Sequence, residues 1–95
     1  MNKEYISTLV KDIFIKHLKL DKNYFSNYSD DGDNLYIVKD LGCDILSRYE
    51  ILNDIEKKCG ILFSDDDVIW KDDLTIFQYI ECIYQNLEKN RFTKF

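Results

Sequence analysis

The first twenty positions of the chain carry apolar residues at steps of three and four. The stripe starts from Tyr5 and continues through Ile6, Leu9, Val10, Ile13, Phe14 and Leu18. Spacing of this kind places side chains on one face of an α-helix. The pattern therefore predicts an amphipathic helix that ends near Leu20.

The helical period is lost over residues 21–43, which collect aspartate, asparagine, serine and two glycines. We interpret this segment as a connection over the surface, longer than most connections in compact domains. Its apolar residues are expected to return onto the core. They are Leu35, Ile37, Val38 and Leu41.

A second helix is predicted to begin after Asp44, because an aspartate there can accept a hydrogen bond from the free N–H groups of the first turn. Its core-facing side is expected to consist of Leu46, Tyr49, Leu52, Ile55 and Cys59. Gly60 follows, and glycine commonly ends helices because it adopts the left-handed conformation without strain.

The remaining residues predict two further helical segments. After an apolar anchor at residues 61–63, Ser64 is expected to cap a short helical turn that includes residues 68–70. Asp72 or Asp73 is expected to cap the last helix. The apolar face of that helix is expected to consist of Leu74, Phe77, Ile80, Tyr84 and Leu87, widened by Ile76 and Ile83.

Composition supports a helical fold. The 95 residues include no proline and three glycines, so the chain has few of the residues that all-β folds need at their turns. With 45% apolar residues, this length suits one compact domain with a modest core. We therefore predict one all-α domain over residues 1–95, a four-helix bundle with a long first loop and a short third helix.

The net charge of -5 and the isoelectric point near 4.7 argue against a nucleic-acid partner, which requires clustered lysine and arginine. Five aspartates fall within residues 65–73 and four within residues 30–40. This uneven distribution of aspartates suits a basic protein partner, because complementary charge steers association. The alternative is that the aspartates lie in solvated loops and serve solubility alone.

The three cysteines, Cys43, Cys59 and Cys82, have no spacing typical of zinc sites or redox pairs. We expect them to be reduced and to act as small buried apolar residues. The sequence shows no signal peptide and no apolar run of membrane length. These features predict a cytoplasmic protein with no membrane partner.

Catalytic chemistry is scarce in this sequence. The single histidine, His17, is expected to interact with the exposed carbonyl groups at the end of the first helix. The run from Ser29 to Asn34 resembles a calcium loop, but in that register the first ligand would be Asn27 and the twelfth Val38. We therefore predict neither an enzyme nor a metal site.

The stretch DLGCDILSRYE, at residues 40–50 within the segment 38–84, resembles an acyl carrier protein. The family pattern reads DLG-x-D-S-L-x-x-x-E-L, followed by the rest of an acidic helix, a short third helix and a fourth helix. The matching positions are Asp40, Leu41, Gly42, Asp44, Leu46, Glu50, Ile55, Gly60 and Ile61. The resemblance implies the same four-helix fold for this chain.

The resemblance breaks at the residue that carries the family's chemistry. In the family, the serine of the D-S-L motif opens the second helix and receives phosphopantetheine. Ile45 occupies that position here, and a hydrocarbon side chain cannot be phosphorylated. Ser47 is the nearest hydroxyl, but two residues along a helix rotate it by about 200° to another side. We therefore expect no cofactor.

Our first hypothesis is a non-catalytic, carrier-like protein that acts by binding another protein. Its concrete form is a small acidic immunity or inhibitor protein for a basic toxin. The expected partner-binding residues are Asp44, Ile45, Arg48, Tyr49, Asp65, Asp66 and Asp67. An exposed aromatic beside a branched aliphatic residue is typical of interface anchors. Tyr49 would equally fit packing into the core with its hydroxyl outward.

The alternative hypothesis is a carrier of acyl or peptidyl groups in fatty-acid or polyketide-type synthesis. The chain would then hold its cargo through Ser47 or enclose a lipid between its helices.

Overall fold

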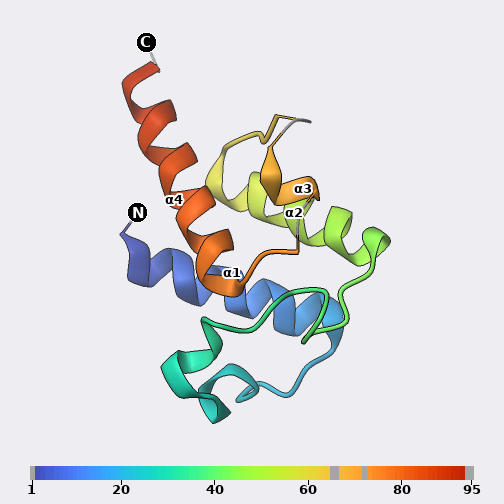
Figure 1. Ribbon diagram of the computed structural model, residues 1–95. Coiled ribbons are helices and arrows are strands. Elements are labelled where there is room, and N and C mark those ends of the chain that lie inside the picture. Colours follow the sequence, from blue (N-terminus) through green and yellow to red (C-terminus); the bar gives the residue numbers. More distant parts are fainter. Residues whose placement is uncertain (1, 65–66, 72, 94–95) are drawn as a thin grey trace.

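The computed structural model describes residues 2–64, 67–71 and 73–93 (Figure 1).

Helix α1 (Lys3–Leu18) is fixed by capping at both ends. The side chain of Asn2 accepts a hydrogen bond from Tyr5 N at 2.8 Å, and Lys19 ends the helix in the left-handed conformation with φ of 56°. The predicted stripe is confirmed, since the buried residues of α1 are Ile6, Val10, Ile13 and Phe14.

Helix α2 (Ile45–Cys59) begins and ends where the sequence predicts. Asp44 accepts a hydrogen bond from Ser47 N at 2.8 Å, which satisfies one of the free donors of the first turn. Gly60 ends the helix in the left-handed conformation, with φ of 66°. The residues that α2 buries are Ile51, Leu52, Ile55 and Cys59.

The predicted core-facing side of α2 is wrong at its N-terminal turns. Leu46 is 69% exposed and Tyr49 is 52% exposed. Six residues along a helix amount to about 600° of rotation, so Leu46 points about 120° away from Leu52. Ile51, which was not predicted to face inward, is fully buried instead.

Helix α3 (Val68–Lys71) is a single turn, and helix α4 (Ile76–Thr93) follows it. Thr75 and Gln78 cap α4 reciprocally: the Thr75 hydroxyl accepts from Gln78 N at 3.1 Å, and the Gln78 side chain accepts from Thr75 N at 2.9 Å. The predicted cap is therefore wrong for Asp73, which binds the preceding connection instead. Asp72 lies outside the described residues.

The core-facing side of α4 is confirmed in part. The predicted residues that are buried are Leu74, Ile76, Ile80 and Ile83. Phe77 is 50% exposed, contrary to expectation, and Tyr79 is fully buried. Tyr79 lies three residues after Ile76 and four before Ile83, so it shares their face of the helix. The ring of Phe14 packs edge-to-face against Tyr79 at 5.6 Å.

The long connection contains two 3-10 turns, Phe25–Asn27 and Ser29–Gly32. Phe25 is buried, and Gly32 packs directly against its ring. Asp30, Asp31 and Gly32 are all left-handed, with φ of 55°, 53° and 77°. Left-handed backbone is costly for residues with a β-carbon, although aspartate tolerates it better than most.

The end of the connection is tied to the segment that leads into α4. Tyr36 forms an isolated antiparallel bridge with Thr75, and Ile37 N donates to Leu74 O at 3.0 Å. Residues 37–41 then form a turn, in which Asp40 N donates to Tyr36 O at 3.0 Å. Ile37 at the start of this turn is fully buried, whereas Val38 is 42% exposed. The expected return onto the core is confirmed for Ile37 and wrong for Val38.

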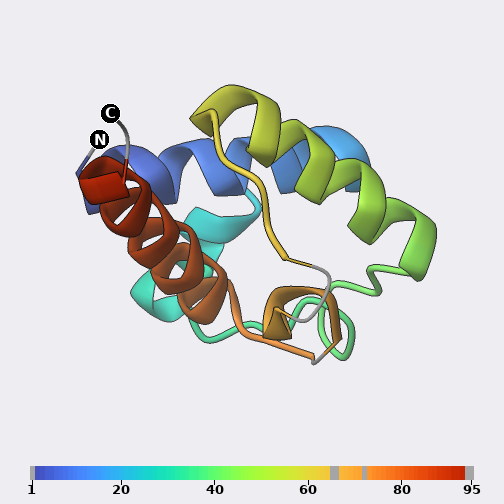
Figure 2. The same ribbon diagram turned by 90° about the horizontal axis from the view of Figure 1, so that it is seen from above.

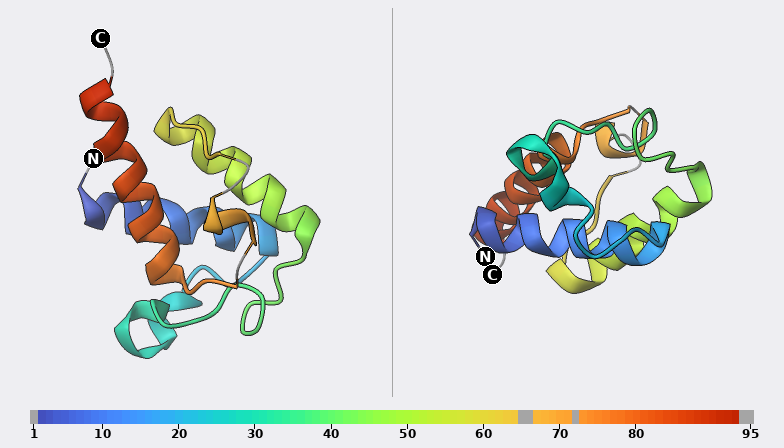
Figure 3. Two further views of the ribbon diagram at one scale, coloured as in Figure 1. Left: turned by 45° about the horizontal axis from the view of Figure 1, so that its top comes forward. Right: turned by 90° about the horizontal axis from the view of Figure 1, so that it is seen from below.

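Helix α1 packs against both α2 and α4. Figure 2 shows the segment after α2 running between α2 and α4 toward α3, and the left view of Figure 3 shows the connection below α1. The radius of gyration is 12.8 Å, close to the value of about 12 Å expected for a compact chain of this length. The described residues form an all-α globule without strands, as predicted. None of their helices is both long and apolar enough to cross a membrane.

His17 lies in the last turn of α1, as expected, and also joins α1 to α2 through Asp54. Its Nε2 lies 3.0 Å from Asp54 Oδ2, and Lys58 Nζ lies 2.7 Å from Asp54 Oδ1. Lys16 Nζ adds a longer contact of 3.7 Å. The hydrogen bond from Lys58 is the main cause that lowers the pKa of Asp54, with His17 and Lys16 also contributing and burial opposing.

We predict that Asp54→Asn lowers the free energy of unfolding near neutral pH by about 1 kcal/mol, because charge-assisted hydrogen bonds at a partly exposed site are lost. The folded pKa of Asp54 lies below the ordinary value of 3.8. This stabilisation is therefore present above that value and is lost as pH falls through the folded pKa. Urea unfolding across this range should show the difference vanish in acid. A difference that is independent of pH contradicts the prediction, and Asp12→Asn on the exposed face of α1 is the control.

Candidate functional site

Three large apolar side chains are exposed on the first turns of α2. Ile45 is 74% exposed, Leu46 69% and Tyr49 52%. We call these three residues the α2 apolar patch. They are presented to solvent because the core-facing side of the helix passes through Ile51, Leu52 and Ile55. Isolated exposed apolar residues are common, but three within five positions are typical of a binding surface.

Asp44 holds the start of this patch in place. The hydrogen bond from Ser47 N lowers the pKa of Asp44, because it favours the ionised carboxylate. Asp44 is fully charged at neutral pH and lies immediately before the exposed Ile45. An apolar anchor therefore stands next to an exposed negative charge.

Tyr49 contacts α3 rather than the interior. Its ring lies 5.0 Å from the ring of Trp70, centre to centre, at an angle of 42°. The alternative expectation, that Tyr49 packs into the core, is wrong because half of the residue is exposed. The indole Nε1 of Trp70 is buried and has no hydrogen-bond partner within the described ranges. Trp70 is the only tryptophan and would report on contacts at Tyr49.

Arg48 reaches toward the interior, between α2, α3 and α4. Its Nε donates to the hydroxyl of Tyr79 at 3.0 Å, and that hydroxyl donates to Ile69 O at 3.1 Å. Burial raises the pKa of Tyr79 to about 12, with Arg48 opposing the shift, so the phenol stays neutral. Arg48, predicted as a partner-binding residue, is thus half-buried and fixes α3 beside the α2 apolar patch.

The acidic residues predicted to flank the patch are placed only in part, since Asp65 and Asp66 lie outside the described residues. Asp67 is half-buried, and its Oδ2 accepts from Ser64 N at 2.8 Å. Asp73 is exposed and accepts from Val38 N at 2.8 Å and from Lys39 N at 3.1 Å. Asp67 therefore orders the backbone next to it, whereas Asp73 binds the end of the long connection.

Ser47, the alternative attachment residue, is half-buried on α2. Its backbone N–H is bound to Asp44, and its position is two residues from Ile45 along the helix. Ile45, the residue that replaces the serine of the motif in the sequence resemblance, is 74% exposed. The exposed side chain of Ile45 carries no hydroxyl to which a prosthetic group could be attached.

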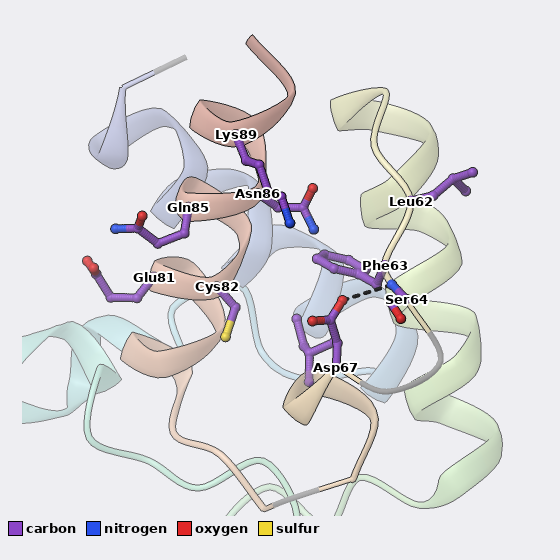
Figure 4. Close-up of a pocket in the computed structure, with 10 residues that line it drawn as sticks. Leu62, Phe63, Ser64, Asp67, Glu81, Cys82, Gln85, Asn86 and Lys89 are labelled. Carbon is purple, nitrogen blue, oxygen red and sulfur yellow. Dashed lines mark hydrogen bonds between the residues drawn. The ribbon is translucent and has the colours of Figure 1, made fainter. Parts of the chain in front are cut away.

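A cavity of about 450 Å³ lies between the segment after α2 and the middle of α4 (Figure 4). Its buried lining includes Phe63 and Ile69, and Leu62 stands at its rim with 81% exposure. Cys82 of α4 lines it as well, and burial raises the pKa of this thiol, which keeps it neutral. The spacing of apolar residues along the sequence does not predict this cavity, because its two walls come from segments that are separate in the sequence.

The other two cysteines are buried, as predicted. Burial raises the pKa of Cys43 to about 11 and also raises the pKa of Cys59, so neither thiol is reactive at neutral pH. Among the residues whose placement is described, no three histidine, cysteine, aspartate or glutamate side chains gather as a metal site would require.

Sequence reasoning missed Leu46, Trp70 and Tyr79 as parts of this region. The rotation of Leu46 away from Leu52 was available from the sequence, whereas the pairing of Arg48 with Tyr79 bridges 31 positions. Comparison with protein-family models, with curated proteins and with solved structures gives no significant match to the chain. A function is therefore inferred from its own residues.

Proposed function

We propose that this protein is a non-catalytic binding module, built on an acyl-carrier-like bundle that lacks the attachment serine, and that it binds a basic protein through the α2 apolar patch. The specific form of the proposal is a small acidic immunity or inhibitor protein that covers a basic toxin.

The exposure of Ile45 carries the proposal. A side chain that is 74% exposed contributes little to the core, yet it is a large hydrocarbon beside two others, Leu46 and Tyr49. Burial of apolar surface against a partner would stabilise a complex by about 25 cal/mol for each Å² removed from water. Aromatic residues such as Tyr49 are also enriched among the residues that dominate binding energy.

The order of the elements supports the carrier-like bundle. A first long helix is followed by a long connection, a second helix capped by Asp44, a single helical turn and a last long helix. The residues that match the family motif, from Asp40 to Leu46, lead directly into α2. Ile45 stands at the exposed start of that helix, where the family carries its prosthetic group.

Charge favours a basic partner. The chain has 18 acidic and 13 basic residues, and Asp44 and Glu50 are exposed beside the α2 apolar patch. Complementary charge speeds association and disfavours acidic partners. The proposed complex is therefore expected to form more slowly as ionic strength rises.

Site-specific cross-linking tests this proposal. A photoreactive benzoylphenylalanine replaces Tyr49 in one variant and Tyr5, which is 55% exposed on α1, in a matched control. Irradiation in an extract of the source cells is expected to join a basic protein to position 49 and not to position 5. Equal yields at both positions, or a cross-linked partner that is acidic, would contradict the proposal.

The group-carrier alternative is favoured by one observation, the cavity beside α4, part of whose lining is apolar through Phe63 and Ile69. Incubation with coenzyme A and a promiscuous phosphopantetheinyl transferase, followed by intact mass measurement, separates the two functions. We expect no added mass on the wild type, and added mass on Ile45→Ser, which restores the family serine at an exposed position. Modification of the wild type that is lost in Ser47→Ala would favour the carrier.

A further inference from the structure

The cavity between residues 62–64, Asp67 and α4 combines buried apolar side chains with a carboxylate. Phe63 is 7% exposed and Ile69 1% exposed, and both line it. Its volume of about 450 Å³ falls within the range of sites that hold small molecules or single side chains. The thiol of Cys82 is neutral and adds to the apolar surface.

Asp67 supplies the charge. Its Oδ2 accepts the hydrogen bond from Ser64 N, whereas Oδ1 has no hydrogen bond or ion pair within the described part of the chain. Figure 4 shows the carboxylate beside Phe63 and Ser64, on the wall of the cavity that faces α4. A half-buried carboxylate oxygen gains most from a charged donor, since charge-assisted hydrogen bonds are about twice as strong as neutral ones.

The remaining charges of the lining favour one orientation of a ligand. Glu81 is already paired with Lys3, whose Nζ lies 2.6 Å from its Oε2. Lys89 lies at the opposite end of the cavity from Asp67 (Figure 4). The ammonium group of Lys3 also lies 5.0 Å from the ring centre of Tyr84, so the side chain of Lys3 contacts both Glu81 and Tyr84 of α4.

We propose that this cavity binds an aliphatic cation, with the alkyl chain against Phe63 and Ile69 and the charged head at Asp67. Two sources have this chemistry: an arginine or lysine side chain of the basic partner, or a free alkylguanidinium or alkylammonium ion. The first source rests on the proposed function, whereas the site itself does not.

Amide NMR with butylguanidinium chloride as the probe tests the site. Saturable shifts are expected at the amides of Phe63, Ser64 and Cys82, in the millimolar range typical of so small a ligand. Asp67→Asn removes the charge while its side-chain oxygen can still accept from Ser64 N, and it is expected to weaken binding by at least about fivefold, or about 1 kcal/mol. Asp12→Asn, a charge-matched control on α1, is expected to leave binding unchanged.

A second variant keeps the test independent of Asp67. Cys82→Leu fills the cavity without altering charge and is expected to abolish the shifts. Hexanoate, an anion with a similar chain, is expected to cause none. Absence of shifts with butylguanidinium, equal binding by Asp67→Asn, or tighter binding of hexanoate would overturn the proposal.

Competition then identifies the source of the cation. If the cross-linked partner inserts a basic side chain, saturating partner displaces butylguanidinium; if the natural ligand is free, both bind together. Failure of the proposed function would appear separately, as the absence of a partner at position 49, and would leave the NMR result for the cavity intact.

Discussion

The double variant Ile45→Ala/Leu46→Ala is expected to bind the cross-linked partner at least about 30-fold more weakly than the wild type, as measured by isothermal titration calorimetry. This factor corresponds to about 2 kcal/mol, the cost of removing one dominant residue of an interface. Both side chains are about 70% exposed, so their truncation leaves the core intact. Alanine also favours helix and changes no charge.

A matched double variant separates this effect from a general loss of surface hydrophobicity. Tyr5→Ala/Phe77→Ala truncates two other apolar residues that are 55% and 50% exposed on α1 and α4. It is expected to change affinity less than about threefold, as remote surface substitutions do. If this control lost as much affinity as the α2 variant, the α2 apolar patch would not be the contact surface.

Gly32→Ala is expected to lower the free energy of unfolding by about 2–4 kcal/mol, from a left-handed backbone and a steric clash acting together. Gly32 has φ of 77°, which residues with a β-carbon rarely adopt. A β-carbon at this position would lie 2.6 Å from Phe25 Cδ1 and 3.3 Å from Leu35 Cδ1. Phe25 is buried and cannot move aside without disturbing the core.

Gly60→Ala is the control for the clash. Gly60 has a similar φ of 66°, but a β-carbon there would meet no atom within 4 Å. Its expected cost is about 1 kcal/mol, from the backbone alone. Urea unfolding of both variants measures the difference, and equal losses would show that the packing of Gly32 against Phe25 contributes nothing.

Features that depend on neighbouring residues could be predicted from the sequence. Asp44 and Gly60 mark the ends of α2 because a cap acts on backbone groups within three or four positions. The cap of α4 was missed because Asp72, Asp73 and Thr75 all carry suitable oxygens. The reciprocal pairing of Thr75 with Gln78 decides among them, together with the use of Asp73 by the connection.

Features that depend on tertiary packing could not be predicted in this way. The core-facing side of α2 is set by where α1 lies, and this turns Leu46 and Tyr49 outward. The contact between Arg48 and the buried Tyr79 joins two helices that are distant in sequence. The exposure of Ile45 was expected from the resemblance, since the family presents its serine at this position.

Methyl NMR of the complex tests the central claim most directly. The isoleucine and leucine methyl groups are labelled with ¹³C, and the cross-linked partner is added in its free form to the unmodified protein. We predict that the methyl signals of Ile45 and Leu46 shift or broaden on binding, while those of the buried Ile13 and Ile55 keep their positions. Unchanged signals at Ile45 and Leu46, with shifts confined to other surfaces, would contradict the account.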